Sequence, residues 1–199
     1  MSLIHLRSEF RAGHLTKAEF IAAMHTEHAA LFDYAAVLPR TDIAAVEITD
    51  DRVVLTVRSS GVKFICDRDD YRIAPIEILN FDTYESAEYD LIRRLIKPGY
   101  TVLDIGANIG WYALTIARWV PDALVHAFEP IPKTFTYLLA NIELNQLPNV
   151  HAHNFGFSNA AGELTFYYYP EGSVNASAAN LSGRADALQI PCQVHTIDA

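Results

Sequence analysis

The spacing of hydrophobic residues in the first part of the chain is that of a helix. Between residues 14 and 38, the apolar side chains near one helical face are Phe20, Met24, Leu31 and Ala35. Thr16 and Glu19 have the spacing of a capping box, which satisfies free N–H groups at a helix start. This pattern predicts a helix over residues 14–38.

After Pro39 the pattern changes to short runs of apolar and β-branched residues. Three such runs are separated by turns of Asp, Ser and Gly, and they span residues 43–48, 52–57 and 61–66. They predict a small antiparallel meander. Residues 71–83 are interpreted as a connection. We therefore expect an accessory region of one helix and a β-meander over residues 1–80.

The rest of the chain, residues 81–199, alternates between the two patterns. Helical runs cover residues 86–96, 111–120 and 133–146. The strand-like runs between them cover residues 100–105, 123–129 and 149–155. This alternation predicts an α/β domain with a parallel sheet and right-handed crossovers. Two further strands, 163–169 and 188–197, are expected on either side of a loop rich in Ser, Asn and Ala.

The turn after the first strand of this domain is rich in glycine. In TVLDIGANIGWYAL (101–114), seven positions hold Asp104, Gly106, Asn108 and Gly110. A strand that runs through such a turn into a helix presents backbone N–H groups, and glycine lets a ligand approach the backbone. Nucleotides bind at this place in doubly wound sheets. The alternative is a structural connection in which Asp104 satisfies amides of the turn.

A second acidic residue strengthens the nucleotide interpretation. Glu129 closes the second strand, 19 residues after Gly110, where a carboxylate can accept hydrogen bonds from both ribose hydroxyls. The dinucleotide pattern G-x-G-x-x-G fails, because Asn108 and Trp111 occupy its second and third glycine positions. A P-loop fails as well, because three residues separate the glycines and no Lys-Ser/Thr follows. The turn therefore suits a nucleoside cofactor without a pyrophosphate.

Three segments together resemble the FkbM family of class I S-adenosylmethionine-dependent methyltransferases. They are VLDIGANIGWYAL (102–114), HAFEPIPKTFTYLLANIELN (126–145) and NFGFSNAAGELTF (154–166). The family's D-x-G-A-N-x-G turn, its F-E-P at the end of strand two and its N-x-x-x-S before a glycine turn recur here in that order. The resemblance runs from about Tyr84 to the end of the chain. It implies a Rossmann-like class I methyltransferase sheet with S-adenosylmethionine as cofactor.

The same resemblance implies roles for residues of the turn. Gly106, Asn108 and Gly110 would wrap the methionine end of the cofactor, with backbone N–H groups near its carboxylate. Asp104 would help to hold the ammonium group, directly or through water.

Five further residues receive roles from the resemblance. Glu129 would bind the ribose, and Pro130 would shape the wall beside it. Asn154 would meet the adenine, although turn chemistry explains this residue equally well. Tyr84 and Glu85 would lie close to the methionine part; for the latter, capping-box spacing from the acid at position 82 is an alternative explanation.

The chain departs from the family pattern near its end. Family members continue past a strand like VHTID into a segment reading roughly D-V-E-G-x-E, which lines the active site, whereas this sequence stops at Ala199. We therefore expect the methyltransferase domain to be truncated, with an open sheet edge beside strand one. Such an edge could pair with another chain, and a homo-oligomer is one form of that pairing.

The composition of the chain limits the kinds of partner and the cellular location that we expect. The net charge of −9 disfavours nucleic acid, whose backbone rewards clustered Lys and Arg. No apolar run approaches the ~20 residues of a membrane span, and no secretory signal is visible. With two cysteines, Cys66 and Cys192, a cytoplasmic chain with free thiols is the simplest interpretation. The spacing of the histidines predicts no metal site and selects no catalytic base.

The sequence as a whole predicts an S-adenosylmethionine-dependent methyltransferase. The resemblance implies O-methylation of a hydroxyl group on a sugar, glycan or secondary metabolite, by direct displacement at the sulfonium methyl. One alternative is a non-catalytic cofactor-binding or interaction module. The other is an NAD(P)-dependent oxidoreductase, which Asn108 and Trp111 in the glycine turn disfavour.

Overall fold

The computed structural model describes residues 2–198 and contains two compact units, which divide between Arg40 and Thr41. The first unit is a helical hairpin of α1 (Leu3–Arg11) and α2 (Lys17–Val37), followed by a short 3-10 turn, η1 (Leu38–Arg40). The rings of Phe10 and Phe20 stack between the two helices, with centroids 4.4 Å apart. The predicted helix and its capping box are confirmed, whereas α1 was not predicted.

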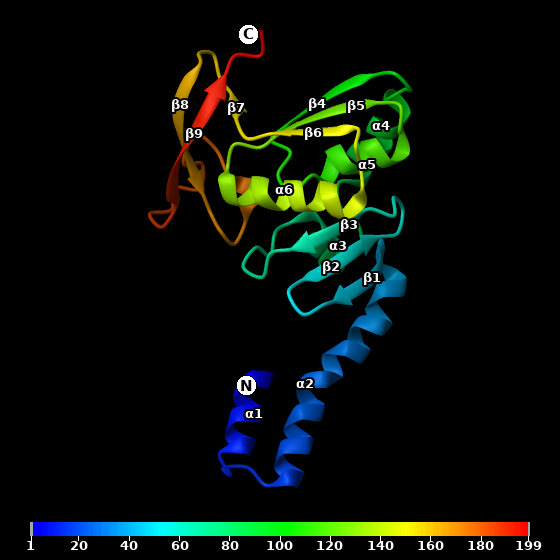
Figure 1. The fold of residues 1–199 in the computed structure, drawn as a ribbon, viewed down its shortest axis with the longest axis vertical. Coiled ribbons are helices and arrows are strands. Elements are labelled where there is room, and N and C mark those ends of the chain that lie inside the picture. Colours follow the sequence, from blue (N-terminus) through cyan, green and yellow to red (C-terminus); the bar gives the residue numbers. More distant parts are fainter. Residues whose placement is uncertain (1, 199) are drawn as a thin grey trace. The chain divides into compact units, whose positions relative to one another are not determined.

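The second unit begins with the predicted antiparallel meander. Its strands are β1 (Ile43–Ile48), β2 (Val53–Val57) and β3 (Lys63–Cys66), and they pair in that order (Figure 1). Consecutive residues are buried in the middle of β2 (Val54 and Leu55) and of β3 (Phe64 and Ile65), so both faces of these strands are covered there.

The segment interpreted as a connection, residues 71–83, contains a helix, so that prediction was wrong. This helix, α3, spans Ala74–Phe81, with Ile73 as N-cap residue and Pro75 in its first turn. Proline is favourable there because the first helical N–H groups lack intrahelical partners. Ile73 and Ile78 are almost fully buried, and tertiary packing stabilises a helix too short to stand out in the sequence.

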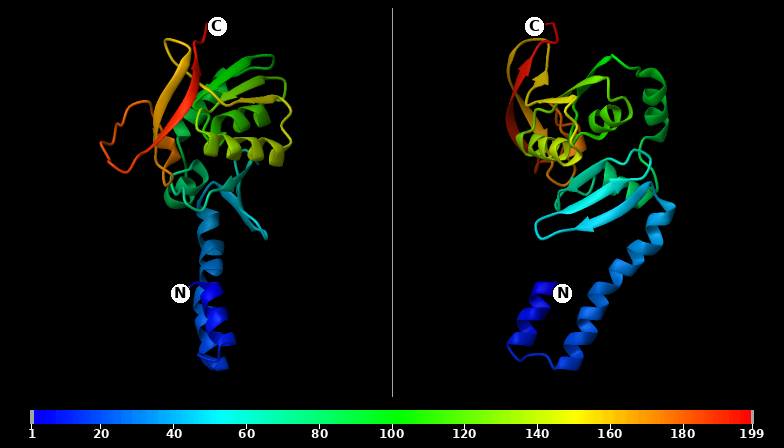
Figure 2. Two further views of the ribbon diagram at one scale, coloured as in Figure 1. Left: turned by 60° about the vertical axis from the view of Figure 1, so that its left-hand side comes forward. Right: turned by 45° about the vertical axis from the view of Figure 1, so that its right-hand side comes forward.

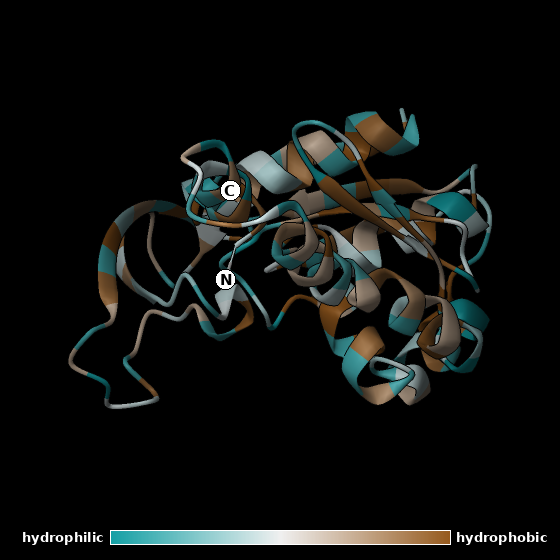
Figure 3. Ribbon diagram, turned by 90° about the horizontal axis from the view of Figure 1, so that it is seen from below, coloured by the Kyte–Doolittle hydropathy of each residue, from teal (hydrophilic) through white to brown (hydrophobic). Residues whose placement is uncertain are grey.

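The parallel sheet has the predicted strand–helix alternation. It contains β4 (Thr101–Ile105), β5 (Leu124–Phe128) and β6 (Val150–His153) in that order, all parallel. The helices between them are α5 (Trp111–Trp119) and α6 (Pro132–Asn145), and α4 (Ser86–Leu95) precedes the first strand. In Figure 1 both crossover helices lie on one face of the sheet. Hydrophobic and hydrophilic residues are interspersed along the helices, as the colours in Figure 3 show.

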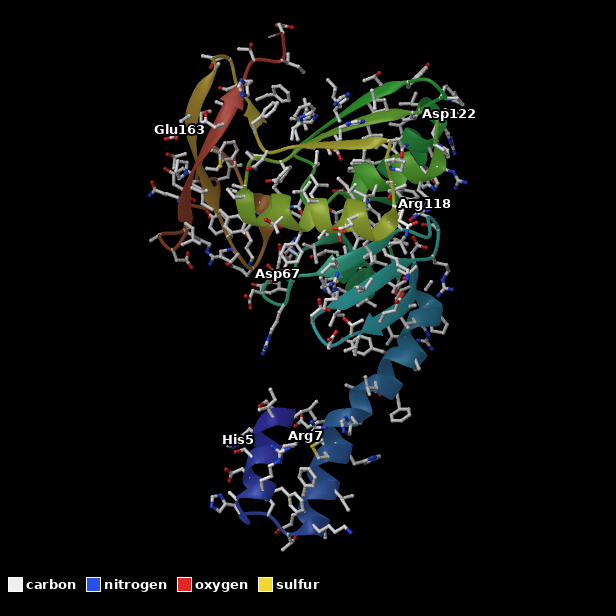
Figure 4. The ribbon with its side chains drawn as sticks, viewed as in Figure 1. His5, Arg7, Asp67, Arg118, Asp122 and Glu163 are labelled. Atoms are coloured by element: carbon white, nitrogen blue, oxygen red, sulfur yellow. The ribbon has the colours of Figure 1, made fainter. Side chains whose placement is uncertain are left out.

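Helix α6 connects the parallel sheet to the meander through two buried amides. Asn141 Oδ1 accepts a hydrogen bond from the backbone of Ile65 at 2.8 Å, and Asn145 exchanges two bonds with Lys63. Arg118, labelled in Figure 4, donates from α5 to the backbone oxygen of Asn145. The edge of β3 therefore has partners on α6, which accounts for polar side chains in the core.

A third small sheet is formed by the last part of the chain. It contains β7 (Gly156–Phe157), β9 (Leu188–His195) and β8 (Gly162–Tyr168) in that spatial order. The predicted strand over 149–155 is shorter than expected, because the chain leaves the parallel sheet after β6. Between β8 and β9, a long loop with the 3-10 turn η2 (Ser173–Asn175) extends from the sheet, in orange in Figure 2.

Strand β4 lies at the edge of the parallel sheet. Its residues Leu103 and Ile105 are about half exposed, as expected for an open edge and an uncovered face. Among residues 2–198, no helix has the length and apolarity that a membrane crossing requires.

Candidate cofactor site

A cavity of about 280 Å³ lies at the carboxyl end of the parallel sheet, within the second unit. Its walls come from the β4–α5 turn, the end of β5, the segment before α4, strand β8 and the loop after it. Seven of the nine residues to which the sequence assigned a cofactor role line it, namely Tyr84, Glu85, Asp104, Gly106, Asn108, Glu129 and Pro130. The topology thus brings these residues together at the edge where such sheets bind ligands.

The two glycines of the turn have different surroundings. Gly106 has φ +83°, and a Cβ there would meet no atom within 4 Å, so the backbone is open to a ligand. Gly110 has φ +97°, and a Cβ would overlap Leu114 Cδ1 and lie 2.8 Å from Leu138 Cδ1. Gly110 therefore permits close packing of α5 on α6 and does not line the cavity.

The backbone amides of the turn are used inside the protein. The N–H groups of Gly106 and Ala107 both donate to Phe128 O at 2.9 Å, and Gly110 N donates to Ala107 O. Asn108 N donates to Glu129, and Ile109 N to the Asn108 side chain. These five N–H groups do not form the open cradle for a carboxylate that the resemblance implied. The turn still lines the cavity, and its backbone is open to a ligand at Gly106.

Glu129 directly follows β5, which ends one residue earlier than predicted, and its carboxylate supports the turn. The residue is 5% exposed. Its Oε2 accepts a hydrogen bond from Asn108 N at 2.9 Å, and its Oε1 accepts one from Ile131 N at 2.8 Å. Burial raises the pKa of Glu129 to about 7, against the lowering effect of these two amides. Each oxygen keeps a second lone pair, so the carboxylate can also accept from a ligand hydroxyl in the cavity.

Asp104 satisfies a backbone amide, which is one of the two interpretations that the sequence left open, and it also lines the cavity. Its Oδ2 accepts from Ala113 N in the first turn of α5 at 2.9 Å, and its carboxyl group also lines the cavity. Burial raises the pKa of Asp104 to about 6, because the charged form is poorly solvated there.

Glu85 differs from the other two carboxylates. Its backbone is left-handed, with φ +43°, and it is the N-cap residue of α4 without a side-chain capping bond. The capping-box explanation with Asp82 is therefore wrong. The Glu85 carboxylate accepts a hydrogen bond from the hydroxyl of Tyr112. Burial raises the pKa of Tyr84 to about 12 and also raises that of Tyr112, so both hydroxyls stay protonated near neutral pH.

A loop distant in the sequence closes one side of the cavity. The Nδ2 group of Asn108, which has φ +50°, donates to Ser173 Oγ at 2.8 Å. Ser173 N in turn donates to the buried carboxylate of Asp70 at 3.0 Å. Val174 and Ala176, next along this loop, also line the cavity. No sequence signal pointed to Ser173 or Asp70 because their partners lie far away along the chain.

Asn154 does not line the cavity. Its Nδ2 group donates to the backbone oxygens of Glu129 and Pro130, at 2.8 and 3.3 Å. It therefore holds the segment behind the cavity wall, in agreement with the turn-chemistry explanation. Among the residues that the structure describes, no group of three His, Cys, Asp or Glu side chains is arranged to hold a metal ion.

The charge of the cavity suits a cationic ligand. Three carboxylates line it, and none of the described residues in its walls is basic. A sulfonium and an ammonium group on an adenosyl molecule complement such walls, while Gly106 and Pro130 offer close apolar approach. The residues present therefore fit S-adenosylmethionine.

Comparison with known proteins agrees with this geometry. Residues 70–157 match the family described as the TRM5/TYW2 methyltransferase domain. The chain is 34% identical over 79 residues to 31-O-demethyl-FK506 methyltransferase FkbM of Streptomyces tacrolimicus, which covers 40% of this chain and 30% of that protein. These matches support a class I S-adenosylmethionine-dependent methyltransferase domain. The narrower assignment to the FkbM family rests on a partial match.

Two other relatives have names that indicate different functions. AMB antimetabolite synthetase AmbE of Pseudomonas aeruginosa is 40% identical over 98 residues, covering 48% of this chain and 5% of that protein. A tRNA(Phe) (4-demethylwyosine(37)-C(7)) aminocarboxypropyltransferase of Methanocaldococcus jannaschii is 41% identical over 49 residues, covering 25% and 20%. The chain thus spans less than a third of each of these three relatives. The net charge disfavoured nucleic acid as a partner. Because one relative modifies tRNA, the comparisons do not support that exclusion.

Proposed function

We propose that this chain binds S-adenosylmethionine in the cavity beside the glycine turn and transfers its methyl group to a hydroxyl of a sugar or secondary metabolite. The observation that carries the proposal is the convergence of Gly106, Asp104 and Glu129 on one acidic cavity at the carboxyl end of the parallel sheet. The cofactor, when bound, supplies an electrophilic methyl group on a sulfonium.

The chain's own residues bind and align the reactants. Asp104 holds the ammonium group, and Glu129 accepts from ribose hydroxyls while keeping the turn in place. Asn108 fastens the loop at Ser173, which excludes water from that side of the cavity. Alignment and exclusion of water are the main contributions a protein makes to such a displacement.

The attacking hydroxyl must lose a proton, and Glu85 is the group we propose to receive it. The carboxylates of Asp104 and Glu129 accept from backbone amides, whereas the described partner of Glu85 Oε2 is the hydroxyl of Tyr112. A strained backbone conformation with no capping function is a frequent feature of functional residues.

A tRNA nucleoside is the second candidate acceptor, favoured by the similarity to the tRNA(Phe) aminocarboxypropyltransferase of Methanocaldococcus jannaschii. The net charge of −9 opposes it, because phosphate contacts need clustered basic residues. The oxidoreductase alternative is disfavoured by Trp111, which occupies a position where dinucleotide-binding turns have a glycine beside the pyrophosphate. Its buried ring packs against Tyr84 and Tyr89.

The test uses cofactor with a labelled methyl group, offered with a pool of neutral sugars and metabolites or with bulk tRNA. We expect saturable binding of S-adenosylmethionine, no binding of NADH, and label in the hydroxyl-bearing small molecules. Label in tRNA alone would replace the proposed acceptor, and binding of NADH without S-adenosylmethionine would overturn the reaction class.

A further inference from the structure

A second cavity, of about 580 Å³, lies on the other side of the loop that closes the cofactor site. Val174 and Ala176 line both cavities, so the two cavities adjoin at this stretch of the loop. The second cavity is bounded by residues 71–72 and by the segment from Tyr169 to Arg184. None of its residues carries a cofactor role in the proposed function.

Charged groups in this cavity are already neutralised. Arg184 is paired with Glu171 at 2.6 Å and with Asp186 at 2.6 Å. Arg72 is paired with Glu77 at 2.5 Å. A ligand that depends on a free positive or negative charge would have to break these pairs, so the cavity favours a neutral ligand.

The polar groups form a fixed network of donors and acceptors. The hydroxyl of Tyr169 donates to Asn180 Oδ1 at 2.7 Å and is 2.5 Å from Ser182 Oγ. The guanidinium of Arg184 lies 5.0 Å from the centre of the Tyr169 ring. Ser177 adds a further hydroxyl to the lining. Such a surface can donate to and accept from several hydroxyls of one ligand.

Exposed apolar side chains stand beside this polar network. Tyr71 is 60% exposed and Leu181 is 83% exposed, and both line the cavity. Figure 2 shows that the loop carrying Leu181 extends away from the third sheet, so its side chain gains little from burial in the fold. Apolar surface next to alternating donors and acceptors matches the C–H face and hydroxyl rim of a sugar ring.

We propose that the second cavity binds the neutral sugar ring of the methyl acceptor. This inference rests on the proposed function: the reacting hydroxyl of the acceptor would reach past Val174 and Ala176 into the cofactor cavity, which Glu85 also lines. It assigns the acceptor site to Tyr71, Leu181 and the Tyr169–Arg184 network.

The experiment measures sugar binding and cofactor binding separately. Saturation-transfer NMR on the full chain with S-adenosylhomocysteine uses methyl glucoside, methyl galactoside and methyl rhamnoside as neutral probes and methyl glucuronoside as the anionic one. We expect transfer to at least one neutral probe, reduced at least threefold in Tyr71→Ala and Leu181→Ala. Tyr100→Ala, which removes a half-exposed ring outside both cavities, is the control and should equal the wild type.

Three results would overturn the inference: no transfer to any neutral probe, transfer to the glucuronoside alone, or unchanged transfer in both cavity variants. Binding of S-adenosylhomocysteine by the wild type, measured in the same samples by calorimetry, distinguishes these failures from failure of the proposed function. If the nucleoside fails to bind, the methyltransferase proposal falls whatever the sugars do.

Discussion

Asp104 and Glu129 keep carboxyl groups where burial opposes their charge. Their pKa values, about 6 and about 7, lie above the ordinary values of 3.8 and 4.5. The folded state therefore holds more protons than the unfolded chain at mildly acidic pH, so the two groups reduce stability as pH rises from about 4 to about 7. A cationic ligand needs the ionised forms, so its affinity should rise over the upper part of the same range.

Asp104→Asn tests this balance. The amide oxygen can still accept from Ala113 N, while the buried charge is removed. We expect the variant to be more stable than the wild type at pH 8, with a free energy of unfolding about 1–3 kcal/mol higher. Near pH 4 the two proteins should have equal stability. Denaturant titrations at both pH values measure this. Equal stability at pH 8 would mean that the Asp104 carboxylate is better solvated than its place in the cavity indicates.

The same variant should bind S-adenosylmethionine more weakly at pH 8, because the ammonium loses an ionic partner. We expect a loss of about tenfold, in the range of a charge-assisted hydrogen bond. Calorimetric titration checks it, and unchanged affinity would assign Asp104 to the support of the turn alone.

Among the elements, the glycine turn has one glycine that supports the fold, Gly110, and another that lines the cavity, Gly106. Gly110→Ala would force a Cβ into Leu114 and Leu138 at φ +97°, so we expect a loss of at least about 2 kcal/mol in unfolding free energy. Gly106→Ala meets no atom within 4 Å and should lose only about 1 kcal/mol, from its φ of +83°. Thermal and denaturant unfolding compare the two.

The opposite order is expected for ligand binding by these variants. Gly106→Ala places a methyl group at the cavity wall, so S-adenosylhomocysteine affinity should fall although the fold persists. A Gly106→Ala variant with wild-type affinity would contradict the close approach of the cofactor to this backbone.

Helix α6 gives a further prediction at the element scale. Asn141→Leu would leave Ile65 N and Ile109 O without their buried partner, which should cost about 2–4 kcal/mol. Glu143→Leu, at an exposed position of the same helix, should change stability by less than about 0.5 kcal/mol. Denaturant titration of both variants checks this, and similar stabilities would show that the amide is dispensable.

Much of this architecture could be predicted from the sequence because period and turn chemistry are local properties. The capping box at Thr16 and the strand–helix alternation after residue 82 are examples that the structure confirms. Helix α3 was missed because eight residues provide a weak periodic signal and its packing partners decide its conformation.

The site could be predicted only in part, for a related reason. The glycine turn and Glu129 can be recognised in the sequence by residue type and spacing. The hydrogen bonds that join Asp70, Asn108 and Ser173 depend on the tertiary fold. Internal use of the turn amides was equally invisible, because it depends on how Phe128 and Glu129 lie beside the turn.

At the scale of the whole molecule, the two cavities would hold the two reactants of the proposed reaction. The acidic cavity lies at the carboxyl end of the parallel sheet, and the charge-balanced one is formed largely by the loop between β8 and β9. Val174 and Ala176 line both cavities, so an acceptor held in the second cavity would present its hydroxyl to the cofactor past these two residues. The net charge of −9 is therefore compatible with a cationic cofactor and a neutral acceptor.

The measurement that addresses the central claim most directly is a calorimetric titration of S-adenosylhomocysteine into the wild type and Glu129→Ala. We predict one site per chain, and an affinity weaker by about 10- to 100-fold in the variant because a buried acceptor for ribose hydroxyls is lost. Circular dichroism of the variant controls for the turn amides that Glu129 also holds. No binding by the wild type, or equal affinity in a folded variant, would contradict the account.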